Sequence, residues 1–309
     1  MKVLICDVVQ DVLLKLLRDN NISFDYFPHI GRSELMKIIG DYEFLIVRGR
    51  THVDKSLIDN AVKLKAIIRF GVGLDNIDVE YAKLKGIDVY NTPLAFTEAV
   101  AELTVALIIG ILRNIGNAHC SMKSGRWEKQ KFYGYELQNK VVGIVGFGRI
   151  GRRVAELLSP FNVKILAFDI VPIPHEYVSK GVIQVESLDD LFLNSDIITI
   201  HVPLTEKTKG MINKNLFLRA TKRPFIINTS RGEVIRIDDL KWALKNHLIR
   251  GVALDVYPHE PFFDEELVSY DNVLLTPHIG AQTFESNEKA AYEVLSIIKK
   301  YIVHHHKEL

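Results

Sequence analysis

Short apolar runs alternate with segments of helical periodicity along most of the chain. In the N-terminal third, runs such as "KVLIC", "EFLIV" and "KAIIR" predict buried strands, and Val12, Leu13, Leu16 and Leu17 mark one face of a helix after Asp11. Ser33 is expected to cap a second helix. Strands that alternate with helices in this way predict a parallel sheet that is covered by helices on both faces.

The same alternation restarts at residue 141, where the predicted strands are "KVVGIVGF", "VKILAFD", "DIITIHV", "PFIINTS", "RGVALDV" and "NVLLTPH". No fixed sequence period links the two halves, which argues against a repeat array. The sequence therefore predicts an α/β protein with two doubly wound parallel-sheet domains.

A long apolar segment, "NTPLAFTEAVAELTVALIIGILRN", connects the two halves. Pro93 is expected to end the preceding strand, and Thr97 is expected to cap the helix that follows. That helix is apolar almost all round, so it needs packing partners on several sides. Burial between the domains and packing against another subunit both meet this need. We favour the second, a homodimer formed through the helix around residues 97–113.

The chain has 309 residues, enough for two domains with separate cores. Its 39 lysines and arginines nearly balance its 38 aspartates and glutamates, so no basic excess points to nucleic acid or to a membrane surface. The apolar segment that contains Glu102 is shorter than the ~20 residues of a membrane span, and a buried helix explains it better.

The N-terminal run "MKVLICDVV" is too short for a signal peptide. Cys6 and Cys120 match no disulfide or metal spacing, and free thiols in the core, consistent with a reducing cytoplasm, are their expected state. We therefore expect a cytoplasmic protein without a metal site. The tail "HHHKEL", which contains His304–His306, is expected to be a solvated end rather than a metal-binding tract.

The stretch "GFGRIG" follows an apolar strand and opens a helix, which is the context of a dinucleotide-binding turn. Gly146 permits the tight turn, Gly148 lets backbone amides approach a pyrophosphate, and Gly151 lets the helix pack closely against the strand. The phosphates would lie at the positive end of the helix dipole, beside the backbone of Arg149 and Ile150.

The next predicted strand ends at Asp169, close to the ~20-residue spacing expected for an acid that binds the adenosine ribose. Its carboxylate can accept hydrogen bonds from ribose hydroxyls but repels a 2′-phosphate, so NAD is favoured over NADP. The alternative is that the glycines serve only a turn and that Asp169 belongs to a solvated loop. Arg152 and Arg153 are expected on a solvent face.

Polar residues follow the predicted strands at their carboxyl ends, where open α/β sheets bind ligands. Arg231, Glu260 and His278 occupy such positions in the second half of the chain, and Arg48 and Arg69 do so in the first half. This set suits hydride transfer to or from a hydroxy acid, with a bound cofactor carrying the hydride.

A histidine, with an ordinary pKa of about 6.5, can give or take the hydroxyl proton, and a carboxylate beside it would orient the ring. Arg231 is suited to polarise the substrate carbonyl and to hold the substrate carboxylate through a bidentate contact. The alternatives are a histidine satisfied within the core at position 278 and a surface loop residue at Glu260, with His259 as a competing candidate.

Five segments, in order, resemble those of the D-isomer-specific 2-hydroxyacid dehydrogenases: "RFGVGLDNID", "GFGRIG", "NTSRGEV", "ALDVYPHEP" and "TPHIGA". The resemblance covers nearly the whole chain and implies that Arg231 binds the substrate, that His278 is the acid/base and that Glu260 is its partner. Further positions implied to bind the cofactor are Val202, Pro203, Thr229, Ser230, Asp255 and Gly280, and those implied to bind the substrate are Arg48, Arg69, Val72 and Gly73.

The resemblance also implies a division of labour between the domains. It assigns residues 96–283 to a Rossmann domain that binds NAD, and residues 1–95 and 284–309 to a flavodoxin-like domain that binds the substrate and acts as a lid. Hinges near residues 92–98 and 281–284 would let the domains close and exclude water during the transfer.

Within this family, "AELT" and "GRWEKQKFYGYEL" are most similar to the D-3-phosphoglycerate dehydrogenases. This similarity implies oxidation of D-3-phosphoglycerate to 3-phosphohydroxypyruvate, the first step of serine biosynthesis, with Arg48 and Arg69 as additional cations for the phosphate. Because the chain stops soon after its last predicted helix, we expect no serine feedback through a further domain. Two alternatives stay open. One is a glyoxylate or hydroxypyruvate reductase or another D-2-hydroxyacid dehydrogenase, and the other is an NAD-sensing binding protein similar to the co-repressors that share this fold and its catalytic residues.

Overall fold

The chain divides into two compact units in the computed structural model, which describes residues 2–305, with side chains described as far as Val303. Unit 1 comprises Met1–Thr97 and Ala281–Leu309, and unit 2 comprises Glu98–Gly280. Each unit has a parallel sheet of its own, so the predicted α/β class with two parallel sheets is confirmed. The functional roles assigned to the two domains stay predictions.

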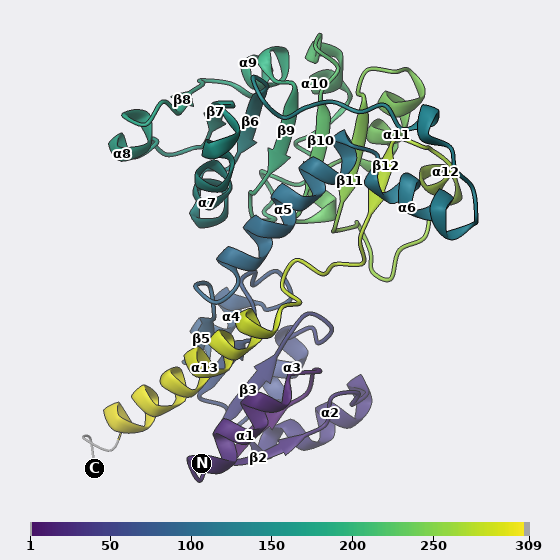
Figure 1. Ribbon diagram of the computed structural model, residues 1–309. Coiled ribbons are helices and arrows are strands. Elements are labelled where there is room, and N and C mark those ends of the chain that lie inside the picture. Colours follow the sequence, from purple (N-terminus) through teal and green to yellow (C-terminus); the bar gives the residue numbers. More distant parts are fainter. Residues whose placement is uncertain (1, 306–309) are drawn as a thin grey trace. The chain divides into compact units, whose positions relative to one another are not determined.

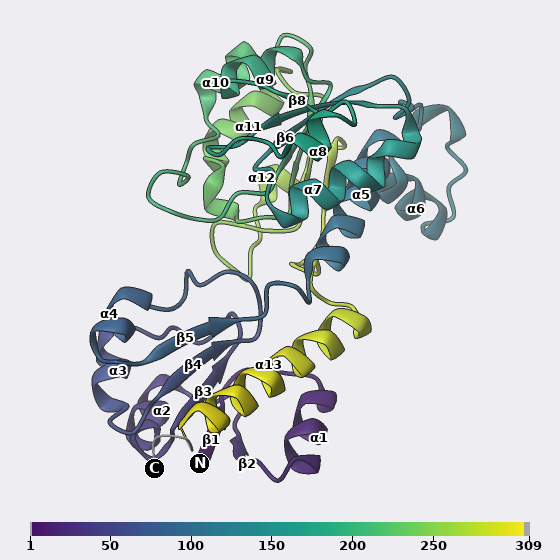
Figure 2. The same ribbon diagram turned by 90° about the vertical axis from the view of Figure 1, so that its left-hand side faces the viewer.

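Unit 1 contains a five-stranded sheet in the order β2-β1-β3-β4-β5. Its strands are β1 (Lys2–Ile5), β2 (Ser23–Tyr26), β3 (Phe44–Val47), β4 (Ala66–Arg69) and β5 (Asp88–Asn91). Its helices are α1 (Asp11–Asp19), α2 (Arg32–Ile38), α3 (Lys55–Asn60), α4 (Val79–Leu84) and α13 (Phe284–His305). Figure 2 shows α1 and α13 on one face of the sheet and α2, α3 and α4 on the other. This strand order is that of flavodoxin-like folds.

The alternation of side chains along each strand produces two cores in unit 1. Val3 and Ile5 of β1 pack with α1 and α13, whereas Leu4 of the same strand packs with α2, α3 and α4. Since both faces are covered, nearly every position of the central strands is apolar, as expected for a parallel sheet.

Unit 2 contains a seven-stranded sheet in the order β12-β11-β10-β9-β6-β7-β8 (Figure 1). The strands are β6 (Val141–Val145), β7 (Lys164–Phe168), β8 (Ile183–Gln184), β9 (Ile197–Ile200), β10 (Phe225–Asn228), β11 (Gly251–Leu254) and β12 (Val273–Leu275). The helices are α5 (Thr97–Leu112), α6 (Ile115–Lys123), α7 (Arg149–Leu158), α8 (His175–Val178), α9 (Leu188–Asn194), α10 (Lys214–Arg219), α11 (Ile237–Lys245) and α12 (Glu265–Val268). Short 3-10 turns occupy Lys129–Lys131, Ser159–Phe161 and Gly232–Val234 in this unit, and Ile39–Asp41 in unit 1.

The strand order of unit 2 fixes where a ligand can bind. Successive strands run outward from β6 in one direction through β7 and β8, and in the other through β9 to β12. The order therefore reverses between β6 and β9, and open α/β sheets bind ligands outside the carboxyl ends of the strands at such a point. One face of the sheet packs on α5 and α7 and the other on α9, α10 and α11, so this edge is the one left for a ligand.

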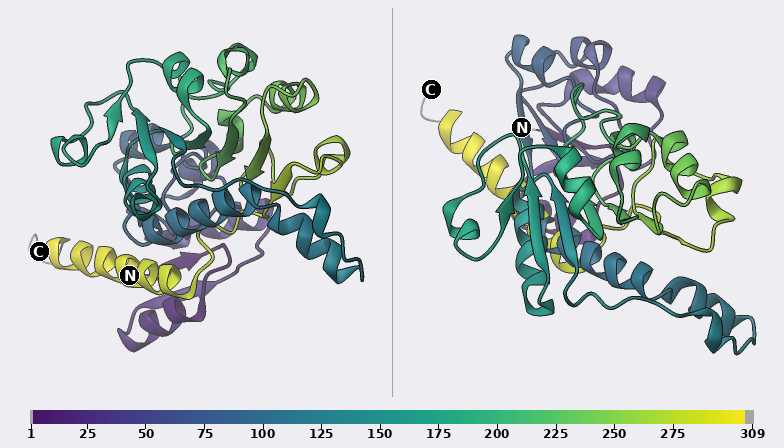
Figure 3. Two further views of the ribbon diagram at one scale, coloured as in Figure 1. Left: turned by 45° about the horizontal axis from the view of Figure 1, so that its top comes forward. Right: turned by 90° about the horizontal axis from the view of Figure 1, so that it is seen from above.

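Helix α5 is largely buried within unit 2, where Leu107, Ile108 and Ile111 belong to the core of the sheet. Thr97 is the first residue of the helix, and its hydroxyl donates to the carbonyl of Pro93 at 3.2 Å. In both views of Figure 3, α6 and the loop that follows it project beyond the strands. Among the described residues, no single helix is long and apolar enough to cross a membrane. Helices α5 and α6 have sufficient length and apolar character only when taken together, and their axes are bent by 69° where they meet.

Three local predictions were wrong. Thr97 does not cap α5, because it is the first helical residue and its hydroxyl donates to a carbonyl instead of accepting from the first turn. Ser33 does not cap a helix, because α2 begins one residue earlier at Arg32 and Gly31 occupies the cap position. Cys120 is not a core thiol, because α6 leaves it exposed, whereas Cys6 is buried and burial raises the pKa of its thiol to about 12. His304–His306, which were expected to belong to a solvated end, lie outside the described side chains.

Candidate active site

The turn after β6 has the backbone geometry that a bound phosphate requires. Gly146 has φ +90°, and a Cβ there would lie 2.7 Å from the carbonyl oxygen of His201. A Cβ on Gly151 would lie 2.2 Å from the carbonyl oxygen of Gly146, so α7 packs directly against the strand. Gly148 precedes the first helical residue, and nothing lies within 4 Å of the place where its Cβ would be. The open space is therefore at the amino end of α7, where Arg149 and Ile150 begin the helix.

Asp169 follows β7 and reaches back to this turn. One carboxylate oxygen accepts a hydrogen bond from the amide of Phe147 at 2.7 Å, and the other accepts from the amide of Val171 at 3.1 Å. The side chains of Arg152 and Arg153 are used elsewhere: Arg152 donates to the carbonyl of Phe147, and Arg153 forms ion pairs with glutamates on α5 and α7.

The other residues predicted to bind the cofactor follow neighbouring strands of the same sheet. Val202 and Pro203 follow β9, Thr229 and Ser230 follow β10, and Asp255 and Gly280 follow β11 and β12. Thr229 forms a 2.9 Å hydrogen bond with Thr104 of α5, and the amide of Gly280 donates to Asp255 at 2.8 Å. Since parallel strands end at a common edge, these positions share the carboxyl edge of the sheet with the glycine-rich turn.

Glu260 and His278 meet at that edge. Oε2 of Glu260 lies 2.7 Å from Nδ1 of His278, and no residue in the described part of the chain bonds to Nε2. Burial raises the pKa of Glu260, but the hydrogen bond and charge of His278, with smaller contributions from the Tyr257 amide and Arg231, outweigh burial and hold it below its ordinary value. An ionised Glu260 requires the proton of a neutral imidazole to sit on Nδ1, which leaves the Nε2 lone pair available.

The backbone around His278 is fixed by a buried carboxylate. Asp255 accepts hydrogen bonds from the hydroxyl of Thr276 at 2.6 Å and from the amide of Ile279 at 2.8 Å. His278 itself has φ +53°, a left-handed conformation that a non-glycine residue adopts only under local constraint. The hydroxyl of Tyr257 donates a hydrogen bond to the carbonyl of Thr276 at 2.9 Å, which connects the loop after β11 to the loop after β12.

Arg231 lies in the loop after β10, next to the loop that carries Glu260. Its Nη1 donates to the carbonyl of Ser230 at 2.7 Å. Gly232 makes the two loops touch, because a Cβ there would lie 1.9 Å from the carbonyl carbon of Tyr257. Unit 2 thus brings together the three residues predicted to be catalytic, at the ends of three adjacent strands.

Unit 1 holds the residues predicted to bind the substrate. Arg48 follows β3 and its guanidinium lies 5.9 Å from the ring centroid of Phe70; burial lowers its pKa, and the charge of Asp7 partly offsets this. Arg69 ends β4 and donates to the carbonyl of Phe70 at 2.6 Å. Val72 is exposed, and Gly73 follows it in the loop after β4.

Two residues that stabilise the loop after β3, Asp7 and Arg50, were not among the predicted site residues. The buried Asp7 accepts a hydrogen bond from the amide of Arg48 at 2.6 Å, and it lies 3.3 Å from Nε of Arg50. Arg50 also donates to the carbonyl of Ile30 at 3.1 Å. Asp7 directly follows an apolar strand, so the rule that identified Arg48 applied to it as well.

His201, which follows β9, was also missed. Burial of its ring lowers its pKa to about 3, so the side chain is neutral over the whole working range of an enzyme. Its Nε2 lies 2.9 Å from the hydroxyl of Thr199. The signal that could have identified His201 in the sequence is its position, a titratable residue directly after an apolar strand.

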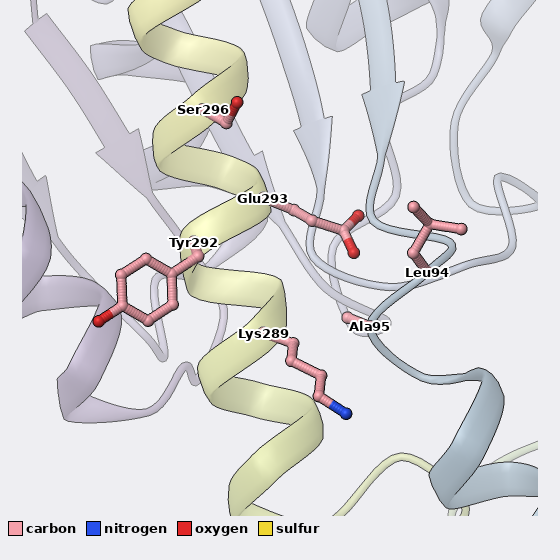
Figure 4. Close-up of a pocket in the computed structure, with 6 residues that line it drawn as sticks. All are labelled: Leu94, Ala95, Lys289, Tyr292, Glu293 and Ser296. Carbon is pink, nitrogen blue, oxygen red and sulfur yellow. The ribbon is translucent and has the colours of Figure 1, made fainter.

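A shallow groove of about 440 Å³ lies elsewhere in unit 1, between α13 and the segment of Leu94 and Ala95. Lys289 and Glu293 point from α13 toward that segment, whereas Tyr292 points away (Figure 4). None of the predicted site residues lines this groove.

Residues 105–280 match the family model of the D-isomer specific 2-hydroxyacid dehydrogenase, NAD binding domain. The chain belongs to this family of oxidoreductases. It is 42% identical over 279 residues to a hydroxypyruvate reductase of Thermotoga maritima, with 88% of this chain and 89% of that protein aligned. The resemblance seen in the sequence motifs is therefore confirmed.

Other relatives differ in length and in named substrate. A D-3-phosphoglycerate dehydrogenase of Methanocaldococcus jannaschii is 40% identical over 302 residues; the match covers 97% of this chain but only 57% of that protein. The chain thus spans little more than half the length of this relative. A solved NADPH-dependent glyoxylate/hydroxypyruvate reductase of Sinorhizobium meliloti, in complex with NADP and malonate, is 26% identical, with a TM-score of 0.86 and coverage of 97% of this chain and 93% of that one.

Proposed function

We propose that this protein is an NAD-dependent dehydrogenase of small D-2-hydroxy acids. The observation that carries the proposal is the 2.7 Å contact between Glu260 and Nδ1 of His278, which leaves Nε2 free to exchange a proton. The contact forms after β11 and β12, at the same carboxyl edge of the sheet as the glycine-rich turn.

The residues of unit 2 fit a dinucleotide. The open space at Gly148 and the amino end of the ten-residue helix α7 suit a pyrophosphate, because the first amides of a helix are free donors. The carboxylate of Asp169 suits a ribose with free hydroxyls and repels a 2′-phosphate, so we propose NAD as the preferred cofactor. The bound nicotinamide supplies the acceptor for the hydride.

The side chains of unit 2 handle the proton and the substrate carboxylate. Nε2 of His278 accepts the hydroxyl proton during oxidation and returns it during reduction. Glu260 stabilises the imidazolium that forms and keeps the ring in one orientation. Arg231 holds the substrate carboxylate and polarises the reacting oxygen through its fork of N–H donors.

For the substrate, we propose D-3-phosphoglycerate, which is oxidised to 3-phosphohydroxypyruvate in the first step of serine biosynthesis. Arg48 and Arg69 are proposed to bind its phosphate, with Val72 and Gly73 binding its carboxylate. The similarity to the archaeal dehydrogenase over 97% of this chain supports this choice. The second candidate is a hydroxypyruvate or glyoxylate reductase, favoured by the relative of matching length.

A direct assay separates the candidates. The purified protein would be given NAD with D-3-phosphoglycerate, and in parallel NADH with hydroxypyruvate or with glyoxylate, while absorbance reports NADH. We expect the largest kcat/KM with the phosphorylated pair, and a lower kcat/KM when NADP(H) replaces NAD(H). Preference for glyoxylate would move the enzyme to the reductases, and failure to turn over any of these acids despite NADH binding would favour the sensing protein.

We also propose that the chain forms a homodimer around α5, with α6 and the following loop extending the surface. Ile115, Met122, Trp127 and Tyr133 expose large apolar groups there, from 52% to 84% of each residue. Apolar groups this exposed are typical of an interface. Sedimentation should give a dimer for the wild type and a monomer for Trp127→Glu; a monomeric wild type at micromolar concentration would rule the proposal out.

A further inference from the structure

A small cavity lies at the amino-terminal edge of the unit 2 sheet. Its volume is about 180 Å³, and its polar lining comes from Asn114, Tyr135, Arg223, Arg250 and Asn272. Arg223 lies two residues before β10, Arg250 directly before β11 and Asn272 directly before β12. The candidate catalytic residues follow the opposite ends of these same three strands. The cavity is therefore separate from the candidate active site.

Arg250 is held in place without a counter-charge. Its guanidinium lies 4.8 Å from the ring centroid of Tyr135, and that ring packs edge-on against Phe225 with centroids 5.7 Å apart. The amide of Tyr135 donates to the carbonyl of Leu112 at 2.8 Å, which fixes the segment that carries the ring. No carboxylate in the described part of the chain pairs with Arg250. The cation is thus oriented by an aromatic face and remains available to an anion.

Arg223 brings a second guanidinium to the same cavity. Its backbone is left-handed, with φ +54°, a conformation that favours glycine and disfavours arginine. The amide of Arg250 donates to the carbonyl of Pro224 at 3.1 Å, so the two arginine loops are in direct contact. Residues 2–303 contain no ion-pair partner for Arg223, whereas the neighbouring Lys222 has Asp196 at 3.8 Å. Two like charges thus line one small cavity, and no carboxylate among residues 2–303 forms an ion pair with either of them.

We propose that this cavity binds a phosphate group, either as inorganic phosphate or as the end of a phosphomonoester. Two guanidinium forks match the tetrahedral oxygens of phosphate, and the donors they present are unused. The cavity is smaller than the roughly 300–1,000 Å³ of sites that enclose drug-sized ligands, so a compact anion fits better than a nucleotide. Binding would relieve the repulsion between the two arginines and stabilise the folded chain.

The test compares thermal unfolding of the full-length wild type and two variants with rising inorganic phosphate, at constant ionic strength set by chloride. Arg250→Gln removes the oriented cation, and Arg223→Gly removes the second one while relieving its left-handed backbone. Arg219→Gln, whose arginine is exposed and paired with Asp189 at 3.2 Å, is the matched control. All four proteins keep the turn at residues 146–151, so differences between them report the cavity alone.

We expect phosphate to raise the Tm of the wild type and the control by several degrees more than that of either variant. Arg223→Gly should have the higher Tm of the two when phosphate is absent. Calorimetric titration should show that the Kd for phosphate is at least ~10-fold larger for Arg250→Gln than for the wild type, as expected when a charged hydrogen-bond donor is lost. A parallel titration with glycerol 3-phosphate distinguishes the sources: a response there assigns a phosphomonoester, and a response to inorganic phosphate alone assigns the free ion. Equal responses in all four proteins would overturn the proposal.

Discussion

A buried carboxylate organises the polar strand ends in each unit, and the two carboxylates differ in their partners. Asp255 of unit 2 accepts hydrogen bonds only from neutral donors, the hydroxyl and amides of the segment 276–280. Asp7 of unit 1 accepts from two amides of the segment 48–51 and also pairs with the guanidinium of Arg50. Both carboxylates are almost completely buried, at 1% and 2% exposure.

This difference assigns different tasks to the two loops. Asp255 accepts hydrogen bonds from neutral groups on either side of His278, and His278 in the same loop pairs with Glu260. In unit 1, Asp7 pairs with Arg50, whereas the guanidinium of Arg48 lies over the ring of Phe70 and has no ion-pair partner among residues 2–303. In the proposed function, one loop presents the group that moves a proton, and the other presents a fixed positive charge.

Replacing the proton-transfer group should have the largest effect. We expect His278→Ala to lower kcat by about 10²–10⁴-fold with little change in KM, since general acid–base catalysis contributes that much. His259→Ala is the matched control, because its ring packs edge-on against Phe262 while the histidine paired with Glu260 is His278, and this variant should keep its turnover. Steady-state kinetics with the preferred acid measure both. Equal losses in the two variants would mean that His278 has no special role.

The buried carboxylates themselves provide the next test. Asp255→Asn and Asp7→Asn each place an amide N–H against donors, so each should lower the free energy of unfolding by about 1–3 kcal/mol. Their kinetic effects should differ: Asp255→Asn should lower kcat, and Asp7→Asn should mainly raise KM. Urea denaturation and steady-state kinetics on the same samples give both quantities. A fall in kcat alone for Asp7→Asn would contradict the division of tasks.

A smaller effect is expected from the fixed charge in unit 1. Arg48→Ala should raise KM for D-3-phosphoglycerate by roughly 10-fold, the cost of a lost charged hydrogen bond. KM for hydroxypyruvate, which has no phosphate, should change little. Arg32→Ala removes an exposed arginine of the same unit, one that pairs with Asp54, and serves as the control. Equal increases with both substrates would indicate that Arg48 binds a carboxylate or supports the loop.

The strands and the glycine-rich turn could be predicted from sequence because each depends on local pattern: apolar runs, and glycines where a Cβ would collide. Glu260 and His278 could be located for the same reason, since each follows a predicted strand. The family resemblance implied their pairing, but the residues alone could not predict the contact, because it depends on β11 and β12 being neighbours in the sheet. The exposed two-residue strand β8 has too little apolar pattern to be recognised. The roles of Asp7 and Arg50 depend on side-chain direction, which periodicity does not determine.

The smallest effect concerns the acid stability of unit 2. The pKa of Glu260 is lower in the folded protein than its ordinary value of 4.5, because the hydrogen bond from His278 and its charge outweigh burial. Between these two values the unfolded chain binds the proton and the folded chain does not, so this stabilisation is complete above about pH 4.5 and is lost as the pH falls through the lowered pKa.

Glu260→Gln cannot take up that proton, so its Tm should fall less steeply than that of the wild type as the pH drops below about 4.5. Glu233→Gln is the control. Glu233 is a half-buried glutamate of the same unit, and its side chain forms no ion pair or hydrogen bond within the described chain. The Tm of this variant should follow the wild-type curve. Parallel Tm curves for the wild type and Glu260→Gln would show that the Glu260–His278 contact adds nothing to stability. The pair would then matter only for holding the ring during proton transfer, and the contrast between the two loops would be one of catalysis alone.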